Sequence, residues 1–362
     1  MYVYCMELLS LMTLGSTWDP LPYPLPPIKS LNAPGASSDV HQGSHTDAVW
    51  GVSWTKNDNV VSISADGSIK QWASSSGEPY RPPNSSTDYQ VPSPHTLGLV
   101  SLSVSPDGRR ALYNSLEGLT SMWNLETGKR EGTFESFMRE EGAGNAEAAW
   151  SVSLSPSGST YASAGGHGNI TIRSAEPENF GKKVSTVFSG RNKFGMCCSY
   201  SPDGKRVALS SEIGHVFILD VESNTFANTY TSHAMSVRSV AWSPDGNLLL
   251  SASEDKRLIL YDVRVSSGNS GGAVATFSGH SSWVLCADIS PDSRFGLSGS
   301  ADKSIKVWDI AARAAVSTVQ DTGEVWSVSW RPRAPAVGSV GAFVSGGEDG
   351  VVKWWRGAGA GV

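Results

Sequence analysis

The sequence predicts an all-β protein built as a single seven-bladed β-propeller, and three observations carry that prediction. A strand-like segment that ends in a tight turn recurs seven times along the chain. The copies are 41 to 50 residues apart, which is the length of one four-stranded blade. Polar and aromatic residues of the same types return at fixed distances after each turn.

The seven copies align on the last strand residue before the turn. Five copies continue there with Ser-Pro-Asp-Gly or a close variant, as in "VRSVAWSPDG", which ends at Gly246. Proline presets φ and glycine tolerates positive φ, so this sequence favours a tight turn between two strands. The aligned residues are Trp54, Val104, Leu154, Tyr200, Trp242, Ile289 and Trp330.

Composition limits the class of function. The chain has 362 residues, 38 glycines, 13 tryptophans and a net charge of -6, without the basic surface expected of a protein that binds nucleic acid directly. The four cysteines lack the spacing of metal ligands, so we expect reduced thiols, no metal and no cofactor. No run of apolar residues is long enough to span a membrane, and the N-terminus lacks the basic region of a signal peptide.

The two ends of the chain predict how the ring closes. The last copy stops after Trp355, without room for its outer strand, so we expect an N-terminal strand at 37–43 to complete that blade. The predicted organisation is a flexible tail at 1–36, a propeller at 37–356 and a short tail at 357–362. Two insertions lengthen early copies, a proline-rich one at 77–94 and a charged one at 135–146.

A serine, a histidine and an aspartate recur in the copies, a set that a hydrolase triad would also need. They are joined by an aromatic residue, and together they predict a buried hydrogen-bond network in which the aspartate accepts from the histidine and the serine meets the indole N–H. The predicted members are His45, Ser62, Asp66, Trp72, His233, Ser251, Asp255, Tyr261, His280, Ser298, Asp302, Trp308, Ser345, Asp349 and Trp355.

Repetition of this set indicates a structural role, because a catalytic triad is needed once. The set is also incomplete in several copies. Copy 4 has Leu209, Ile213 and Leu219 at the serine, aspartate and aromatic positions. Copy 3 has His167 and Arg173 at the aspartate and aromatic positions, and copy 7 has Asp321 in place of histidine. A structural device tolerates such decay and an active site does not. We therefore predict no catalytic residue and no enzyme activity.

The position four residues before each aligned strand end carries residues that vary between copies. It opens the innermost strand, so we expect it at one mouth of the central channel, on the top face. The predicted protein-binding residues there are Trp50, Trp150, Trp326, Met196, Arg238 and Leu285, with Asp47, Glu147 and Glu324 shortly before the tryptophans. Aromatic rings beside carboxylates suit a peptide that carries an arginine and a bulky apolar residue. The alternative is that these tryptophans only pack between blades.

The Gly-His and Trp-Asp signatures, such as Gly279-His280 followed by "VWD" at 307–309, resemble the WD-repeat family over about 45–356. Copy-specific words resemble more narrowly the family of WD-repeat subunits of the Ski complex. They include "HTDAVWGVSW" (45–54), "SHAMSVRSVAWSPD" (232–245), "GHSSWVLCADISPD" (279–292) and "EVWSVSW" (324–330).

That resemblance implies a scaffold in the cytoplasm and nucleus whose top face binds other proteins. The implied partners are a tetratricopeptide-repeat subunit and a DExH-type RNA helicase, in an assembly that feeds RNA to the exosome for 3′-to-5′ mRNA decay. Further implied partners are a meiotic double-strand-break protein and a transcription-elongation complex.

A competing interpretation is a substrate receptor of a cullin ubiquitin ligase. The segment "LILYDVR" (258–264) approximates the Trp-Asp-x-Arg box of such receptors, with Tyr261 in place of tryptophan and Arg264 at the basic end.

Overall fold

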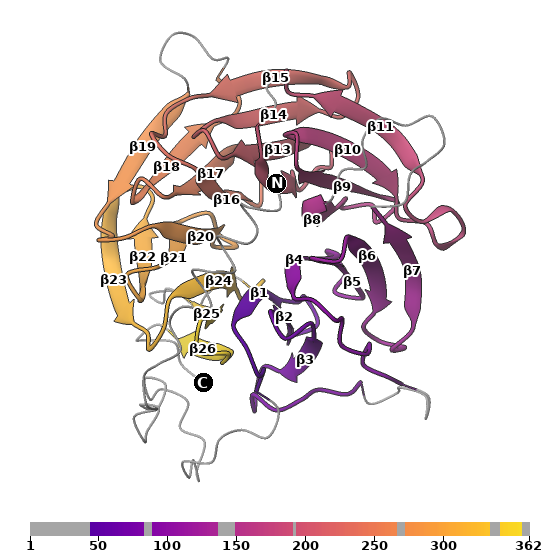
Figure 1. Cartoon of the computed structure of the whole chain (residues 1–362). Helices are drawn as coiled ribbons and strands as arrows, with labels where there is room; N and C mark the ends of the chain where they lie inside the picture. The colour runs from indigo at the N-terminus through magenta and orange to yellow at the C-terminus, as the bar shows by residue number, and fades with distance from the viewer. Residues whose placement is uncertain are drawn as a thin grey trace.

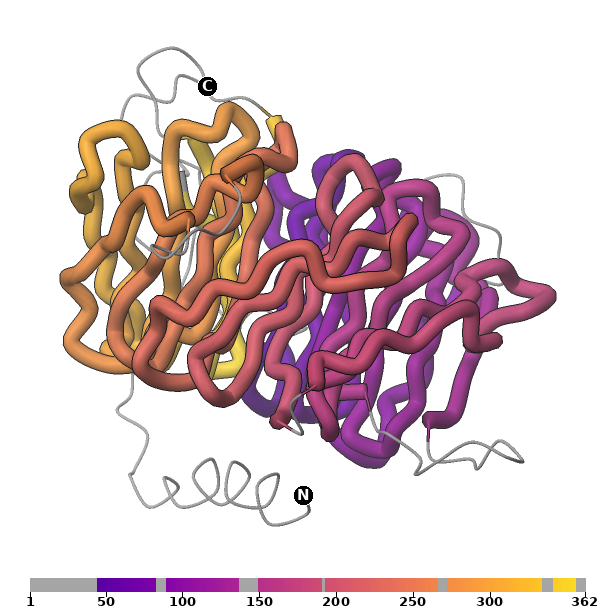
Figure 2. The backbone as a smooth tube through the Cα atoms, turned by 90° about the horizontal axis from the view of Figure 1, so that it is seen from above, coloured from indigo at the N-terminus to yellow at the C-terminus, as the bar shows by residue number. Residues whose placement is uncertain are grey.

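The chain forms a closed ring of seven antiparallel sheets around a central channel (Figure 1). The computed structural model describes residues 44–82, 89–136, 149–190, 193–265, 272–333 and 341–356. Within these residues five sheets have four strands and two have three. A view turned by 90° shows the sheets side by side around the ring (Figure 2). The prediction of an all-β, seven-bladed propeller is confirmed.

Each blade runs outward from the channel in chain order. The innermost strands are β1 (Val49–Trp54), β4 (Leu99–Val104), β8 (Ala149–Leu154), β12 (Gly195–Tyr200), β16 (Val237–Trp242), β20 (Val284–Ile289) and β24 (Val325–Trp330). The second strands are β2 (Asn59–Ser64), β5 (Arg110–Ser115), β9 (Thr160–Gly165), β13 (Arg206–Ser211), β17 (Leu248–Ser253), β21 (Phe295–Ser300) and β25 (Ala342–Gly347).

The outer half of each blade is less regular. The third strands are β3 (Ile69–Ala73), β6 (Leu119–Asn124), β10 (Asn169–Ser174), β14 (Val216–Asp220), β18 (Arg257–Asp262), β22 (Ser304–Asp309) and β26 (Lys353–Arg356). The outer strands are β7 (Arg130–Glu135), β11 (Lys183–Phe188), β15 (Thr225–Tyr230), β19 (Ala273–Ser278) and β23 (Ala314–Gln320). A 3-10 turn, η1 (Pro177–Asn179), lies between β10 and β11.

The hydrophobic core lies between neighbouring blades. One cluster joins Leu250, Leu258 and Phe277 of blade 5 to Val284 and Trp308 of blade 6, and all five side chains are buried. The second strands are buried almost throughout because both of their faces are covered by adjacent sheets. This explains why their sequences read as nearly continuous apolar and small residues rather than as an alternation.

The predicted Ser-Pro-Asp-Gly turns follow the aligned strand ends. In blade 2 the Ser105 hydroxyl donates to the Asp107 carboxylate at 2.5 Å and accepts the Arg110 N–H at 2.9 Å, while Gly108 adopts a φ of 73°. Blade 6 has Ser293 in the glycine position, with a φ of 59°. The turn is therefore held by side-chain hydrogen bonds as well as by backbone preference.

Serine side chains join the innermost strands of adjacent blades. Ser101 and Ser103 of β4 accept the N–H groups of Val152 and Leu154 of β8, at 3.0 and 2.9 Å. The same pattern joins β8 to β12 through Ser151 and Ser153. Strands of different sheets cannot share a ladder, so these hydroxyls satisfy backbone groups that would otherwise remain unpaired in the narrow channel.

Asp288 takes the place of a serine at the junction of blades 6 and 7. Its carboxylate accepts the Trp330 N–H at 2.7 Å and the Ile289 N–H at 2.8 Å. Burial raises the pKa of Asp288 to about 6, although both backbone donors work to lower it.

The ring closes where β24 meets β1 (Figure 1). Ser327 and Ser329 accept the N–H groups of Val52 and Trp54, at 2.9 and 3.1 Å. Arg331 adds a two-pronged ion pair with Asp58, at 2.9 and 2.5 Å. The first and last copies are thus joined at the channel by the serine pattern that also joins blades 2 to 3 and 3 to 4, with an additional ion pair.

The three-stranded blades are 1 and 7. In blade 1 part of the predicted 77–94 insertion lies along the outer edge: Pro79 bridges Trp72, and the Tyr80 N–H donates to Gln71 O at 2.8 Å. Residues 79 and 80 of this insertion therefore pair with the outer edge of β3. The closing strand predicted at 37–43 for blade 7, and residues 137–146 of the second insertion, lie outside the described residues.

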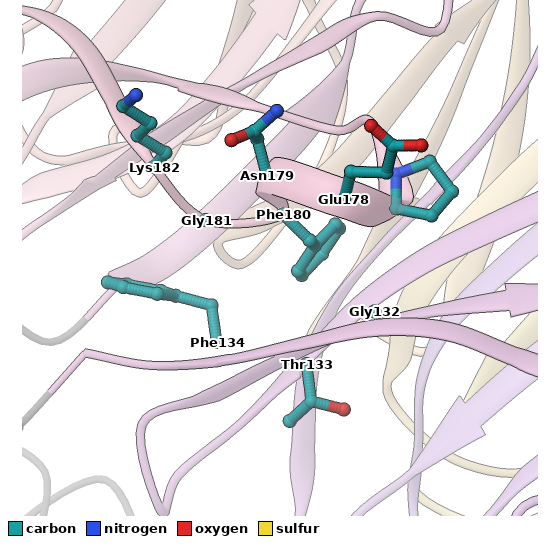
Figure 3. Close-up of a pocket in the computed structure, with 9 residues that line it drawn as sticks. Gly132, Thr133, Phe134, Glu178, Asn179, Phe180, Gly181 and Lys182 are labelled. Carbon is teal, nitrogen blue, oxygen red and sulfur yellow. The ribbon is translucent and has the colours of Figure 1, made fainter.

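Blades 2 and 3 interlock at their outer rim around a groove of about 390 Å³ (Figure 3). Phe180, just after η1, lies over Gly132 of β7, and Phe134 of β7 lies over Gly181. The rings approach so closely that a Cβ on either glycine would fall 2.3 Å from the facing phenylalanine. Arg173 completes this Phe–Gly clasp, with its guanidinium 4.2 Å from the centre of the Phe134 ring.

Candidate protein-binding face

The variable position of the seven copies is a β-bulge in every blade. Pairing between the first and second strands skips one residue at the same place each time. The skipped residues are Trp50, Val100, Trp150, Met196, Arg238, Leu285 and Trp326, and all seven are partly buried. A bulge re-aims its side chain and ends the regular pairing. The chain thus presents five kinds of side chain from one backbone position, three of the seven being tryptophans.

This bulge lies at the end of the channel that carries the loops before the innermost strands. In blade 1 the Ala65 N–H, from the turn after β2, donates to Ala48 O at 2.9 Å, and the Ser64 hydroxyl donates to Asp47 O at 3.0 Å. The loop before β1 and the turn after β2 therefore frame the same mouth. The described residues of the predicted set lie at this bulge or in the loop before the innermost strand, and we call the seven bulge residues the channel-mouth set.

Trp50 and Trp326 stack on each other across the junction of blades 1 and 7. Their ring centres are 6.3 Å apart and their planes differ by 15°. Both indole N–H groups are buried and have no acceptor among the described residues. A buried donor without an acceptor costs about 1–3 kcal/mol. The two indole rings are therefore held together by stacking, and neither indole N–H donates a hydrogen bond to a described residue of the propeller.

Trp150 lies apart from this pair. Its ring packs edge-on against Phe194, which precedes the next inner strand, with the ring centres 5.7 Å apart. Blade 2 separates it from Trp50 and contributes Val100 at the bulge. Of the three predicted tryptophans, the structure thus brings two into contact and places the third in a second aromatic cluster.

Arg238 forms a third feature of the mouth. Its guanidinium pairs with Glu254 at 2.5 Å and lies 5.9 Å from the centre of the Trp283 ring. Trp283 and Met235 are 36% and 44% exposed, which is high for large apolar side chains. Sequence reasoning did not single out Trp283, Met235 or Phe194. The words "HAMSVRS" and "SSWVL" contain the first two, but nothing in a single sequence says that they face solvent.

The three predicted carboxylates differ in their surroundings. Asp47 is exposed and accepts the Ala48 N–H at 2.7 Å. Glu324 is close to a second acid: its N–H donates to the Glu348 carboxylate at 3.1 Å. Burial raises the pKa of Glu324 above its ordinary value, and Glu348 raises it further, against a smaller opposing effect of Lys303. Glu147 lies outside the described residues.

Three blades contain the predicted hydrogen-bond network. The histidine Nε2 lies 2.7 Å from the serine hydroxyl in His45–Ser62, His233–Ser251 and His280–Ser298. On the other side of the ring, Nδ1 lies 3.3, 2.8 and 2.9 Å from Asp66, Asp255 and Asp302. Trp72 and Trp308 donate their indole N–H to the serine at 2.7 and 2.8 Å. Tyr261 takes the aromatic place in blade 5 and stacks on Tyr230 at 4.3 Å.

Charges within the network are fixed by its surroundings. Burial lowers the pKa of His45 to about 4, although Asp66 partly opposes this, and burial also lowers the pKa of His280. Burial alone would raise the pKa of Asp66, but hydrogen bonds from Ser68 and Thr46 outweigh it and hold the value at about 2. At neutral pH the aspartate is therefore charged and His45 is neutral. The proton must lie on Nδ1, so that Nε2 accepts from the serine.

The other blades replace the network in different ways. In blade 2 His95 pairs with Glu117 at 3.5 Å, but Tyr113 stands in the serine place and the His95 Nε2 has no partner among the described residues. In blade 7 Lys353 bonds to Asp321, Asp349 and Thr322, so a lysine supplies the donors that histidine supplies elsewhere. Trp355 still donates to Ser345 at 2.8 Å.

In the segment that resembles a ligase-receptor box, both distinctive residues make contacts within blade 5. Tyr261 is fully buried in the blade 5 network, and Arg264 forms an ion pair with Asp262 at 2.6 Å. In the described part of the chain no cluster of three or more metal-ligating side chains occurs, and no helix there has the length and apolar character of a membrane span.

Comparison with known proteins agrees with this architecture. The family described as WD domain, G-beta repeat, matches residues 38–73, 224–262 and 271–309. The first match begins seven residues before His45, in the region of the predicted closing strand.

Related proteins align over much of the chain. Meiotic recombination protein rec14 of Schizosaccharomyces pombe is 34% identical over 324 residues, which is 89% of this chain and 97% of the relative. WD repeat-containing protein SL1-17 of Schistosoma mansoni is 29% identical over 62% of this chain and 70% of its own length. WD repeat-containing protein VIP3 of Arabidopsis thaliana is 26% identical over 56% and 63%. The sequence repeats, the seven closed blades and the nearly full-length match to rec14 together show that this chain belongs to the WD-repeat family.

Proposed function

We propose that this protein is a non-catalytic scaffold that binds partner proteins at the channel mouth. The observation that carries the proposal is the channel-mouth set: one bulged position, repeated seven times, carries five kinds of side chain, with tryptophan in blades 1, 3 and 7, whereas the hydrogen-bond network recurs with the same histidine, serine and aspartate in three blades. Fold maintenance favours repetition, whereas recognition of an asymmetric ligand requires positions that differ. Partly buried aromatic rings are frequent anchors in protein interfaces.

More narrowly, we propose that the partners are the tetratricopeptide-repeat subunit and the DExH-type RNA helicase of a Ski-type complex. In that role the propeller holds the two together in the cytoplasm for exosome-mediated 3′-to-5′ mRNA decay. The copy-specific words in four of the blades support this assignment through their resemblance to the WD-repeat subunit of that complex.

We also propose a nuclear role with a meiotic double-strand-break protein. The relative that aligns over 97% of its length is named for meiotic recombination, and this supports the second role. The same mouth would serve both partners, because Trp50, Trp326 and Glu324 offer one apolar and acidic surface. A peptide with an arginine and a bulky apolar residue fits that chemistry.

Affinity capture followed by mass spectrometry tests the proposal. The tagged full-length chain is compared with a Trp50→Ala/Trp326→Ala variant and with Val100→Ala, which changes the same bulge position in blade 2. We expect the native chain and Val100→Ala to recover a tetratricopeptide protein and a helicase, and the double variant to lose both. Recovery of a ubiquitin-ligase adaptor in their place, or equal recovery by all three chains, would contradict the proposal.

A further inference from the structure

The chain contains six Ser-Pro dipeptides, and the structure divides them sharply. Five belong to the blade turns, where the serine is at most 5% exposed and its hydroxyl bonds to a side chain two residues on. These five are Ser105, Ser155, Ser201, Ser243 and Ser290. Their hydroxyls hold the turns together and are inaccessible to an enzyme in the folded chain.

Ser93 is the sixth, and its surroundings are different. It is exposed, and so is Pro94 after it. The segment 90–94 belongs to no strand, and its backbone groups make no hydrogen bond to any residue of the described ranges. It is anchored at both ends instead: Tyr89 donates to Gln71 Oε1 at 3.1 Å, and the His95 N–H donates to Gly67 O at 2.9 Å.

We propose that Ser93 is a phosphorylation site for a proline-directed serine/threonine kinase. Kinases of this class take a short extended segment in which proline follows the acceptor. Pro94 disfavours helical backbone at Ser93 and offers no N–H that would need a partner in the kinase. Val91 and Leu97, which are 47% and 49% exposed, supply apolar contacts on either side of the acceptor.

The reaction is an ordinary phosphoryl transfer from ATP. The Ser93 Oγ forms a bond to the γ-phosphorus, the bond to the ADP oxygen breaks, and the hydroxyl proton passes to the base of the kinase. The product adds about two negative charges to the outer rim of blade 1. The Ser93 hydroxyl makes no hydrogen bond to a described residue, so no such bond is lost by the modification. The 77–94 insertion would thus be a regulatory addition to a blade that it also helps to cover.

The test uses the folded full-length chain, a purified proline-directed kinase and ATP, with phosphopeptide mapping. We expect one phosphorylated Ser-Pro serine, Ser93, in the native chain, no phosphate at any Ser-Pro serine in Ser93→Ala, and strongly reduced incorporation in Pro94→Ala. The chain unfolded in urea and diluted into the same assay is the control, because it should also accept phosphate at the turn serines. A native chain that lacks phosphate at Ser93, or carries it at the turn serines, would overturn the proposal. The result is independent of partner binding.

Discussion

The Trp50 and Trp326 rings stack 6.3 Å apart although 276 residues separate them in the chain. They belong to the first and last innermost strands, which are held together by Ser327, Ser329 and the Arg331–Asp58 ion pair. The Trp50–Trp326 stack therefore forms only when the ring is closed. The junction of blades 1 and 7 therefore contributes both to the stability of the ring and to the surface proposed to bind partners. The two contributions are measured separately, by denaturation and by binding.

The histidine networks should contribute unequally to stability. His280→Ala removes a partner from both Ser298 and Asp302 and should lower the free energy of unfolding by about 1–3 kcal/mol. His95→Ala is the matched control in blade 2, where Nε2 already lacks a partner, and it should cost less. Urea denaturation of the two variants checks the order. Equal losses would show that the serine link adds nothing.

Stability should fall as the pH drops below about 6.5. The folded pKa of His45, about 4, lies below its unfolded value, so the unfolded chain binds more protons between pH 6.5 and 4 and is favoured there. For one such group the change is on the order of 2–3 kcal/mol. Asp66 and Asp302, each with a pKa of about 2, extend the loss at lower pH. Asp288 opposes it between about pH 6 and 4, because its folded pKa is raised.

Denaturation at a series of pH values measures this slope. His45→Gln should flatten it between pH 6.5 and 4, whereas Asp288→Ser should steepen it. If His45→Gln and the native chain change stability equally between pH 6.5 and 4, the assignment of a neutral, buried His45 is contradicted.

Closure of the ring should depend on both chain ends. We expect deletion of residues 1–43 to lower the melting temperature markedly, because blade 7 has only three strands among the described residues. An unchanged melting curve would refute the closing strand. Asp58→Asn, which weakens the ion pair with Arg331, should cost less, about 1 kcal/mol. Differential scanning calorimetry on the two variants separates the two contributions.

The Phe–Gly clasp should stabilise the junction of blades 2 and 3. Phe180→Ala removes a ring that stacks on Tyr161 at 5.4 Å and covers Gly132, and we expect a loss of about 2–4 kcal/mol. Gly132→Val should be at least as harmful, because its Cβ would collide with Phe180. Phe188→Ala is the control, since this phenylalanine is 70% exposed. Chemical denaturation that ranks Phe188→Ala with Phe180→Ala would count against the clasp.

The sequence predicts the ring well because its evidence is local. Each aligned residue from Trp54 to Trp330 ends an innermost strand in the structure, since a strand and its turn are specified by neighbouring residues. The hydrogen-bond partners of His45 and His280 follow from the same repetition. Features that recur from copy to copy can therefore be predicted from a single sequence.

Other features were beyond such reasoning. The bulge at the variable position is a backbone property with no residue signature. The separation of Trp150 from Trp50 follows from the position of Val100 in the ring, and the clasp depends on two glycines that look ordinary in sequence. The clasp arises from contacts between blades, which the spacing of the repeats does not encode.

The most direct test of the channel mouth compares affinity with stability in the same variants. The purified tetratricopeptide-repeat partner is titrated against the native chain, Trp326→Ala and Val100→Ala, and each chain is melted in parallel. We expect Trp326→Ala to weaken binding by about tenfold or more, equivalent to about 1.4 kcal/mol, while its melting temperature stays close to that of Val100→Ala. A Trp326→Ala chain that melts much earlier yet binds with native affinity would show that the stacked tryptophans only pack the ring.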